Sequence, residues 1–185
     1  MKTYEVPAYR ISLVKDSSAK VSDKPSVRSS AEVYSLMKHY YVDADRESFH
    51  ILMLDAKNKI IGVSCISTGS LTSSLAHPRE AFKPVVAWND AQRGKAEKWA
   101  LESLTPEQQQ SLNKQICEII CRHSCCAIIL AHNHPSGDPT PSQEDLHTTR
   151  RLRDIGDIMG VRVLDHVIVG EGKYVSFVDD GYWEK

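Results

Sequence analysis

Residues 131–145 read "AHNHPSGDPTPSQED", with two histidines one residue apart and an acid that follows a loop with three prolines. An apolar, β-prone run precedes this stretch, and a run with helical periodicity follows it. Side chains two residues apart in an extended strand project to the same face. His132 and His134 can therefore direct two imidazoles toward one point, while Asn133 faces away.

The C-terminal part of this stretch predicts the start of a helix. Ser142 is a suitable N-cap, which places Asp145 at the third helical position, where the positive end of the helix favours a carboxylate. Pro135, Pro139 and Pro141 restrict the intervening loop and reduce the entropy lost when the acid meets the histidines. Two imidazole nitrogens, one carboxylate oxygen and an open fourth position are the ligand set of a catalytic zinc site.

Each of these features alone also has an ordinary structural explanation. An acid in the first turn stabilises a helix without binding a metal, and two histidines one residue apart often occur by chance. The combination is more specific, because every spacing from His132 through Ser142 to Asp145 satisfies a geometric requirement of a metal site. We therefore favour a metal centre over packing.

The same spacing resembles the JAMM motif of JAB/MPN metalloproteases, HxHP-x(6)-S-x(2)-D. The longer strings "HNHPSGDPTPSQEDLHTT", "HPREAFKP" and "LDHVIVG" are similar to the RadC-like branch of that family, over roughly residues 4–87 and 124–183. The resemblance implies an α+β or mixed α/β fold, in which a mixed β-sheet is flanked by helices in the JAB/MPN (cytidine deaminase-like) architecture. It also implies one zinc ion per chain, held by His132, His134 and Asp145, with a water as the fourth ligand.

The resemblance further implies a general base, which in this family is a glutamate at the start of an early strand. Glu47 lies between a helix predicted at 30–41 and the first strongly apolar strand, which matches that placement. Glu80 is the competing candidate, although an acid is expected in the first turn of its helix for the dipole alone. Ser142 is expected to help hold the developing oxyanion, and His166 to have a structural role or to orient a ligand.

The chain divides into two parts in this interpretation. Residues 1–29 are predicted to form an edge strand and a linker, and residues 30–185 the RadC-like JAB/MPN domain. Helical patterns from about 79 to 104 and at 106–123 predict a helical insertion at about 88–117, because family members are expected to have one short helix there. Strands and helices alternate without a regular βαβ order, which by itself favours an α+β or mixed α/β sheet.

The five cysteines are interpreted as thiols. Cys117, Cys121 and Cys125 are spaced by four and would share one helical face, so a metal or redox site is an alternative. No Cys-x-x-Cys pair occurs, and the neighbouring isoleucines favour buried packing instead.

Composition limits the classes of partner and location. The 23 basic and 24 acidic residues are well mixed and give a net charge of −1, which makes direct nucleic-acid binding unfavoured. The run Arg150, Arg151 and Arg153 is predicted to be a solvated helix face. No run approaches the ~20 apolar residues of a membrane helix, and no signal peptide is recognisable, so the predicted location is cytoplasmic.

The function predicted from these observations is a zinc-dependent metallopeptidase or isopeptidase that hydrolyses an amide bond of an unknown protein or peptide substrate. The alternative is a non-catalytic JAB/MPN interaction module, accessory to DNA repair as the branch name suggests. All the motif residues are present in this chain, which favours the enzyme.

Overall fold

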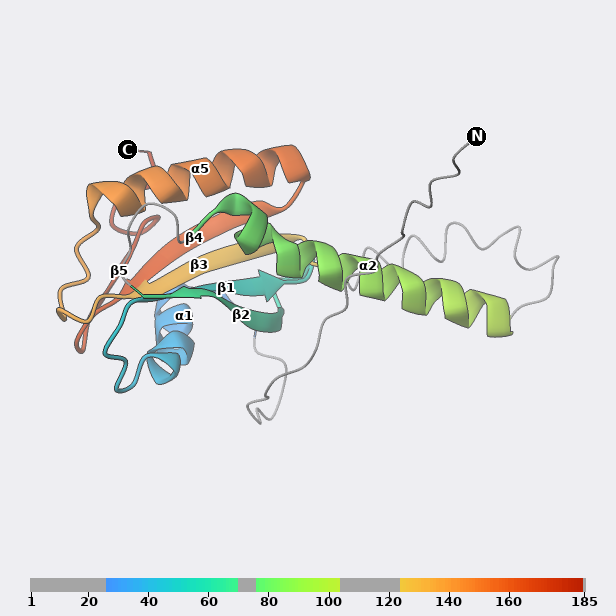
Figure 1. The fold of residues 1–185 in the computed structure, drawn as a ribbon, viewed down its shortest axis with the longest axis horizontal. Helices are drawn as coiled ribbons and strands as arrows, with labels where there is room; N and C mark the ends of the chain where they lie inside the picture. The colour runs from blue at the N-terminus through green and yellow to red at the C-terminus, as the bar shows by residue number, and fades with distance from the viewer. Residues whose placement is uncertain (1–25, 70–75, 104–123, 185) are drawn as a thin grey trace, which may run out of the picture.

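The computed structural model describes residues 26–69, 76–103 and 124–184. These residues form a five-stranded mixed sheet with the strand order β2-β1-β3-β4-β5 and helices on both of its faces (Figure 1). The predicted mixed sheet flanked by helices is therefore confirmed. The predicted N-terminal edge strand and the helix at 106–123, with Cys117 and Cys121, lie outside the described residues.

The first two strands form a hairpin. Strand β1 (Ser48–Leu54) pairs antiparallel with β2 (Ile60–Thr68) across a short polar turn. The Asp55 carboxylate accepts the backbone N–H groups of Lys57 and Lys59, and Asn58 adopts a φ of 55° in the left-handed region that asparagine tolerates. Polar residues therefore make this turn because their side chains satisfy its backbone donors.

Strand β3 (Ala127–Asn133) is the centre of the sheet. It runs antiparallel to β1 and parallel to β4 (Arg162–Val169), and β5 (Tyr174–Ser176) pairs antiparallel with β4. Strand β5 is short because the chain turns after Ser176, whose carbonyl accepts the Asp180 N–H.

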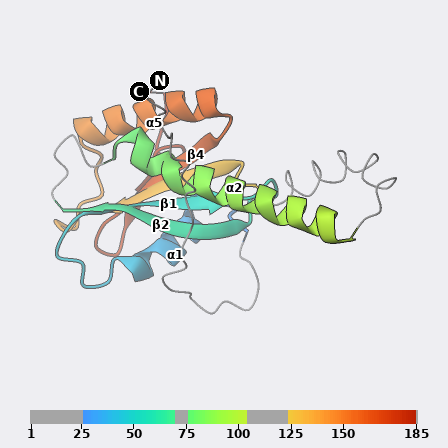
Figure 2. The same cartoon turned by 45° about the vertical axis from the view of Figure 1, so that its right-hand side comes forward.

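The alternation of side chains along the strands assigns the two faces. Phe49, Ile51 and Met53 pack toward α2 (Pro78–Ser103) and α5 (Gln143–Met159), whereas Leu52 and Leu54 pack toward the opposite helix. That helix is α1 (Ser30–Met37), continued by the 3-10 turn η1 (Lys38–Tyr40), and Figure 2 shows it on the opposite side of the sheet from α5. The same alternation in β3 puts Ile128 and Leu130 on the α5 face. His132 therefore belongs to the α5 face and Asn133 to the α1 face.

Helix α2 is one continuous helix of 26 residues, as the helical pattern to about residue 104 predicted. Its N-terminal part packs on the sheet through Ala81, Phe82 and Val85, and its C-terminal part extends past the end of the sheet (Figure 1). The Asn89 carboxamide accepts the Cys125 N–H at 2.7 Å and donates to the Cys125 carbonyl at 3.4 Å, which ties α2 to the start of β3. The predicted bounds of the insertion, about 88–117, stay a prediction.

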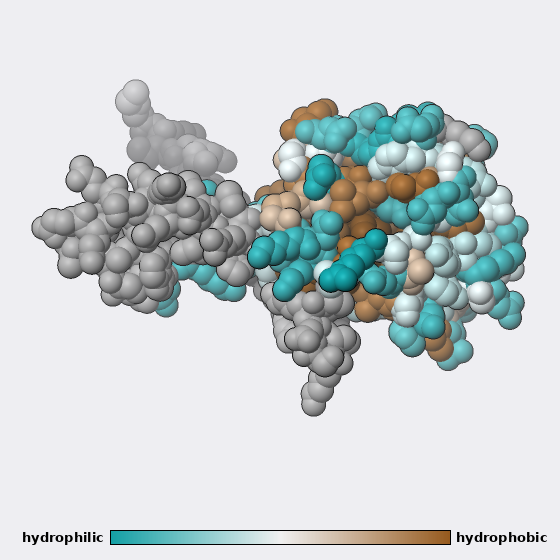
Figure 3. Space-filling view, turned by 180° about the vertical axis from the view of Figure 1, so that it is seen from behind, coloured by the Kyte–Doolittle hydropathy of each residue, from teal (hydrophilic) through white to brown (hydrophobic). Residues whose placement is uncertain are grey.

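The surface corrects one expectation about the arginine run. Arg150 and Arg151 are exposed, but Arg153 is half-buried, stacks on the Trp183 ring at 4.8 Å and donates to the Trp183 carbonyl. It anchors the C-terminal segment to α5. Among the described residues, no helix combines the length and apolar character that crossing a bilayer requires. Seen from behind, hydrophilic side chains cover much of the upper rim where α5 lies, with apolar surface below them (Figure 3).

Candidate metal centre

Three side chains that the sequence singled out as metal ligands lie together at one end of the sheet. His132 is the penultimate residue of β3, His134 directly follows that strand, and Asp145 is in the first turn of α5. Their Nε2 and carboxylate atoms lie within 4.8 Å of one another. The His132 and His134 Nε2 atoms are 2.9 Å apart, and each faces one oxygen of Asp145, at 3.3 and 3.6 Å.

The start of α5 holds Asp145 in place. Ser142 is the predicted N-cap, and its hydroxyl accepts the Asp145 N–H while the Asp145 carboxylate accepts the Ser142 N–H, so the two residues form a capping box. The single hydroxyl proton of Ser142 is donated to Asp145 Oδ2 at 2.6 Å. To donate to a developing oxyanion instead, this hydroxyl has to rotate away from the carboxylate.

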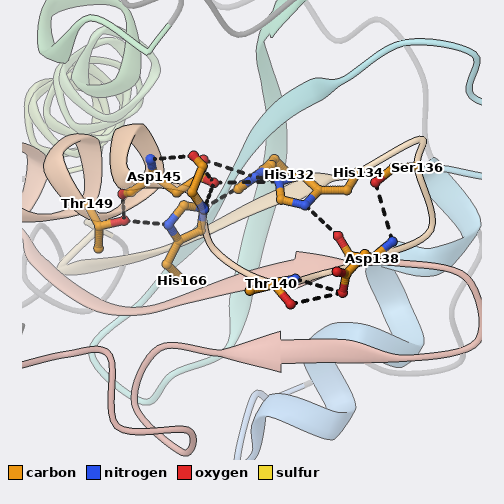
Figure 4. Close-up of polar contacts among 9 residues, drawn as sticks. His132, His134, Ser136, Asp138, Thr140, Asp145, Thr149 and His166 are labelled. Atoms are coloured by element: carbon orange, nitrogen blue, oxygen red, sulfur yellow. Dashed lines mark hydrogen bonds and ion pairs between the residues drawn. The ribbon is translucent and has the colours of Figure 1, made fainter.

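A buried hydrogen-bond relay determines which nitrogen of His132 carries a proton (Figure 4). Thr149 Oγ1 donates its only proton to the Asp145 carbonyl at 2.6 Å, so it must accept a proton from His166 Nδ1, also at 2.6 Å. Neutral His166 then accepts at Nε2 from His132 Nδ1, at 2.8 Å. His132 consequently carries its proton on Nδ1 and presents the lone pair of Nε2 to Asp145 and His134.

A second contact determines the tautomer of His134. Its Nδ1 donates to the Asp138 carbonyl at 2.7 Å, so neutral His134 also presents the lone pair of Nε2 (Figure 4). The loop itself is held by the neighbouring β4–β5 turn, since His134 N–H donates to the Val169 carbonyl and Glu171 N–H to the Gly137 carbonyl. A side chain at Gly170 would lie only 2.4 Å from the Gly137 carbonyl oxygen, which makes glycine necessary there.

The pKa values of these groups follow from burial and from the acid between them. Burial lowers the pKa of His132 to about 4 and lowers the pKa of His166 well below its usual value. Burial also opposes the charged form of His134, but hydrogen bonds to Asp145 and to the Asp138 carbonyl raise its pKa overall, assisted by the charge of Glu47. Despite burial, hydrogen bonds and nearby charge from His134, His132 and Ser142 hold the pKa of Asp145 below its usual range.

The donor set fits a metal cation. Two imidazole lone pairs that face each other repel unless a proton or a cation lies between them, and the carboxylate beside them adds negative charge. The Nδ1 atoms of both histidines donate hydrogen bonds, which leaves the lone pairs of their Nε2 atoms available to a cation. Among the described residues, His132, His134 and Asp145 are the single group of at least three potential metal-binding side chains whose donor atoms converge.

A cleft of about 700 Å³ opens over this centre, and Glu47 is part of its wall. His134, Ser142 and Asp145 line the same cleft. The ladder pairs Phe49 with His132, so Glu47 precedes β1 at the same end of the sheet as the candidate ligands, and its negative charge acts on His134.

Glu80, the competing general base, lies elsewhere. It is in the first turn of α2, half exposed, and forms ion pairs with Arg79 at 3.2 Å and Lys83 at 3.8 Å. Glu80 is not among the residues that line the cleft over the candidate ligands.

Sequence reasoning missed Thr149, which has no motif of its own. Its role depends on contacts with Asp145, four residues earlier, and with His166, seventeen residues later. The three cysteines among the described residues, Cys65, Cys125 and Cys126, are free thiols, as the sequence analysis predicted.

The sequence profile of the RadC-like JAB domain family matches residues 27–93 and 99–182. The chain belongs to this family. The matched part of this RadC-like JAB domain includes the three candidate ligands, Glu47 and Ser142, and the match is interrupted at residues 94–98, within α2.

Several bacterial relatives are similar to this RadC-like JAB domain. UPF0758 proteins of Geobacter sulfurreducens and Symbiobacterium thermophilum are 41% and 43% identical to it over 150 and 135 residues, which are 81% and 73% of the chain. The same alignments cover 50% and 43% of those two relatives. The chain therefore spans about half the length of the curated relatives that it matches.

Proposed function

We propose that this chain is a zinc-dependent hydrolase of amide bonds, a metallopeptidase or isopeptidase that acts on a protein or peptide. The observation that carries the proposal is the convergence of His132, His134 and Asp145 beneath a cleft that Glu47 also lines. Membership of the RadC-like JAB domain family supports it. An open cleft suits a segment of polypeptide better than a small enclosed substrate.

The three candidate ligands would hold one zinc ion. When bound, zinc supplies a Lewis acid that polarises a carbonyl and lowers the pKa of water to about 7. Two neutral imidazoles and one carboxylate are a ligand set typical of catalytic zinc.

Glu47 is assigned the proton transfer. Its carboxylate would accept a proton from the attacking water and pass it to the leaving amine, so it must face the ligands without being one of them. Its place in the cleft wall and the effect of its charge on His134 support this role. Ser142 would donate to the developing oxyanion after its hydroxyl leaves Asp145 Oδ2.

Two near-isosteric variants separate these roles. Glu47→Gln should retain zinc at the parental level but lower the hydrolysis rate by about 10²–10⁴-fold, because an amide cannot accept the proton. Asp145→Asn should lose zinc affinity, since a neutral amide is a poorer ligand than a carboxylate. Zinc content is measured by mass spectrometry of the metal, and cleavage with peptide and isopeptide libraries.

Two further variants test the location of the metal. His132→Ala should strongly reduce zinc content, and Cys121→Ser should leave it unchanged. If Cys121→Ser loses zinc while His132→Ala retains it, the proposed location of the metal at His132, His134 and Asp145 is wrong. If the zinc-loaded parent cleaves no amide substrate, the non-catalytic interaction module replaces the enzyme as the function.

A further inference from the structure

Asn133, the residue between the two histidines, is buried on the side of the sheet away from the metal ligands. It is 4% exposed, and both ends of its carboxamide are hydrogen-bonded. The Ser48 N–H donates to its Oδ1 at 2.8 Å, and its Nδ2 donates to the Arg46 carbonyl at 3.0 Å. These two contacts bracket Glu47 from both sides along the chain.

We propose that Asn133 is a positioning residue, which holds Glu47 at a set place relative to the metal ligands; the proposal rests on the hydrolase function proposed above. The regular backbone pairing between β1 and β3 ends, on the side of the cleft, at the pair Phe49 and His132. Beyond that pair, the Asn133 side chain bonds the backbone of Ser48, the first residue of β1, and of Arg46, two residues before it, at the edge of the cleft. The Gly69 N–H, one residue after β2, donates to the Glu47 carbonyl at 2.9 Å and provides a third hydrogen bond that holds this part of the backbone.

The consequence is that the general base and two ligands share one support. His132 and His134 are the immediate chain neighbours of Asn133, so a displacement of that strand end would move all three together. A catalytic group must be held within about 0.5 Å of its productive position, and a loop end such as 42–47 would not provide this by itself. The carboxamide provides one donor and one acceptor in the geometry that this backbone requires.

The first experiment needs neither metal nor substrate. Hydrogen exchange of the Ser48 amide should accelerate at least tenfold in Asn133→Ala, because its acceptor is removed. Asn133→Asp, which keeps the acceptor and loses the donor, should protect Ser48 more than Asn133→Ala does. Unchanged exchange at Ser48 in Asn133→Ala would overturn the proposal, whatever the activity of the parent.

A matched control is available on α2. Asn89 brackets the backbone of Cys125 with its carboxamide in the same way, remote from the cleft. Asn89→Ala should lower the unfolding midpoint by an amount similar to Asn133→Ala, while Ser48 exchange and turnover remain parental. An equal effect of both variants on Ser48 would indicate general loosening and would count against a specific role of Asn133.

The second experiment asks whether Asn133 acts through Glu47. Asn133→Ala should lower kcat by about 10–100-fold with KM and zinc content near parental. In a Glu47→Gln background the same substitution should cost less than twofold, because the group that it positions is already inactive. Additive losses in the double variant, or loss of zinc from Asn133→Ala, would show that Asn133 supports the metal or the fold instead.

The paramagnetic signal of cobalt, loaded in place of zinc, gives a readout independent of turnover. Broadening of the Glu47 side-chain resonances should weaken in Asn133→Ala, and broadening at His134 should not. If no amide is cleaved but Ser48 exchange and this broadening change as expected, the hydrolase function fails while the positioning of Glu47 stands. If Glu47 broadening is unchanged, Asn133 does not position it.

Discussion

The proton positions around His132 show how much of the candidate centre depends on single hydroxyl and imidazole groups. Thr149 can donate only once, and its contact with the Asp145 carbonyl therefore determines the tautomers of His166 and His132 in turn. A residue that touches no metal thus decides which nitrogen of His132 is available to one. The proposed zinc affinity should be sensitive to groups two contacts away from the ligands.

Thr149→Val tests this dependence with little change in volume. The variant removes the acceptor for His166 Nδ1 and allows the opposite tautomer, in which His132 carries its proton on Nε2. We expect zinc affinity to fall about 10–100-fold, measured by competition with a chromogenic chelator. Thr148→Val, one residue earlier in α5, is the control and should bind zinc as the parent does. Parental affinity in Thr149→Val would mean that the relay does not set the tautomer.

Thiol chemistry tests the packing role of the cysteines. Burial raises the pKa of Cys125 to about 11, so its thiolate, the reactive form, should be on the order of 0.1% at pH 8. The fraction rises with pH, and alkylation of Cys125 should rise with it. Cys65, which is exposed, should react first with iodoacetamide at pH 8, as peptide mass spectrometry would reveal. Equal labelling of both thiols in the folded protein would contradict the burial of Cys125.

At the scale of elements, the position of α5 on the sheet is what brings Asp145 to the histidines. The helix begins at the Ser142 cap, ends at Gly160 with a φ of 68°, and packs Leu152 into the core between. Near its C-terminus the backbone approaches the chain before β4 very closely at Gly156. The short connection to β4 is therefore possible only with a glycine at that point.

A pair of glycine-to-alanine variants tests this contact. A methyl group at Gly156 would lie 2.5 Å from the Val161 carbonyl oxygen, so Gly156→Ala should destabilise the fold by about 1–3 kcal/mol despite alanine's higher helix propensity. At Gly94 in α2, the methyl group would meet no described atom within 4 Å, and Gly94→Ala should stabilise by up to about 1 kcal/mol. Urea unfolding measures both. The same sign for the two variants would refute the close approach.

At the scale of the whole molecule, the candidate ligands join segments that are distant in the chain. Strand β3 supplies His132, the loop after it His134, and α5 Asp145, while β4 supplies His166 behind them. A cation that binds all three ligands would therefore link the centre of the sheet to the helix above it. Binding of this kind stabilises the native state, because an unfolded chain cannot hold the ligands together.

We expect zinc to raise the unfolding temperature. At a free zinc concentration of 100 times Kd, the gain is about 2.7 kcal/mol, which corresponds to roughly 5–10 °C for a domain of this size. Scanning calorimetry with zinc and with a chelator measures the shift, and Asp145→Asn should show a much smaller one. An equal shift in Asp145→Asn would locate the stabilising zinc at another site.

Local patterns in the sequence predicted much of the described secondary structure and the candidate ligand set. The cap at Ser142, the alternation in β3 and the spacing to Asp145 depend on residues close in the chain, so their physical meaning can be read without the fold. The spacing also predicted that His132 and Asn133 face opposite sides. Glu47 was selected through the family resemblance, and its placement in the cleft wall agrees with that choice, although its role stays a prediction.

The partners of those residues were decided only by the tertiary structure. Asn133 meets Arg46 and Ser48 across 87 and 85 residues, and His132 meets His166 across 34. Arg153, predicted to be solvated, meets Trp183 thirty residues later. Periodicity specifies which face of a strand or helix a side chain occupies, but not which distant segment covers that face. Strand order and register determine that, since they bring segments together whose hydrogen-bonding groups have no signal in the local sequence.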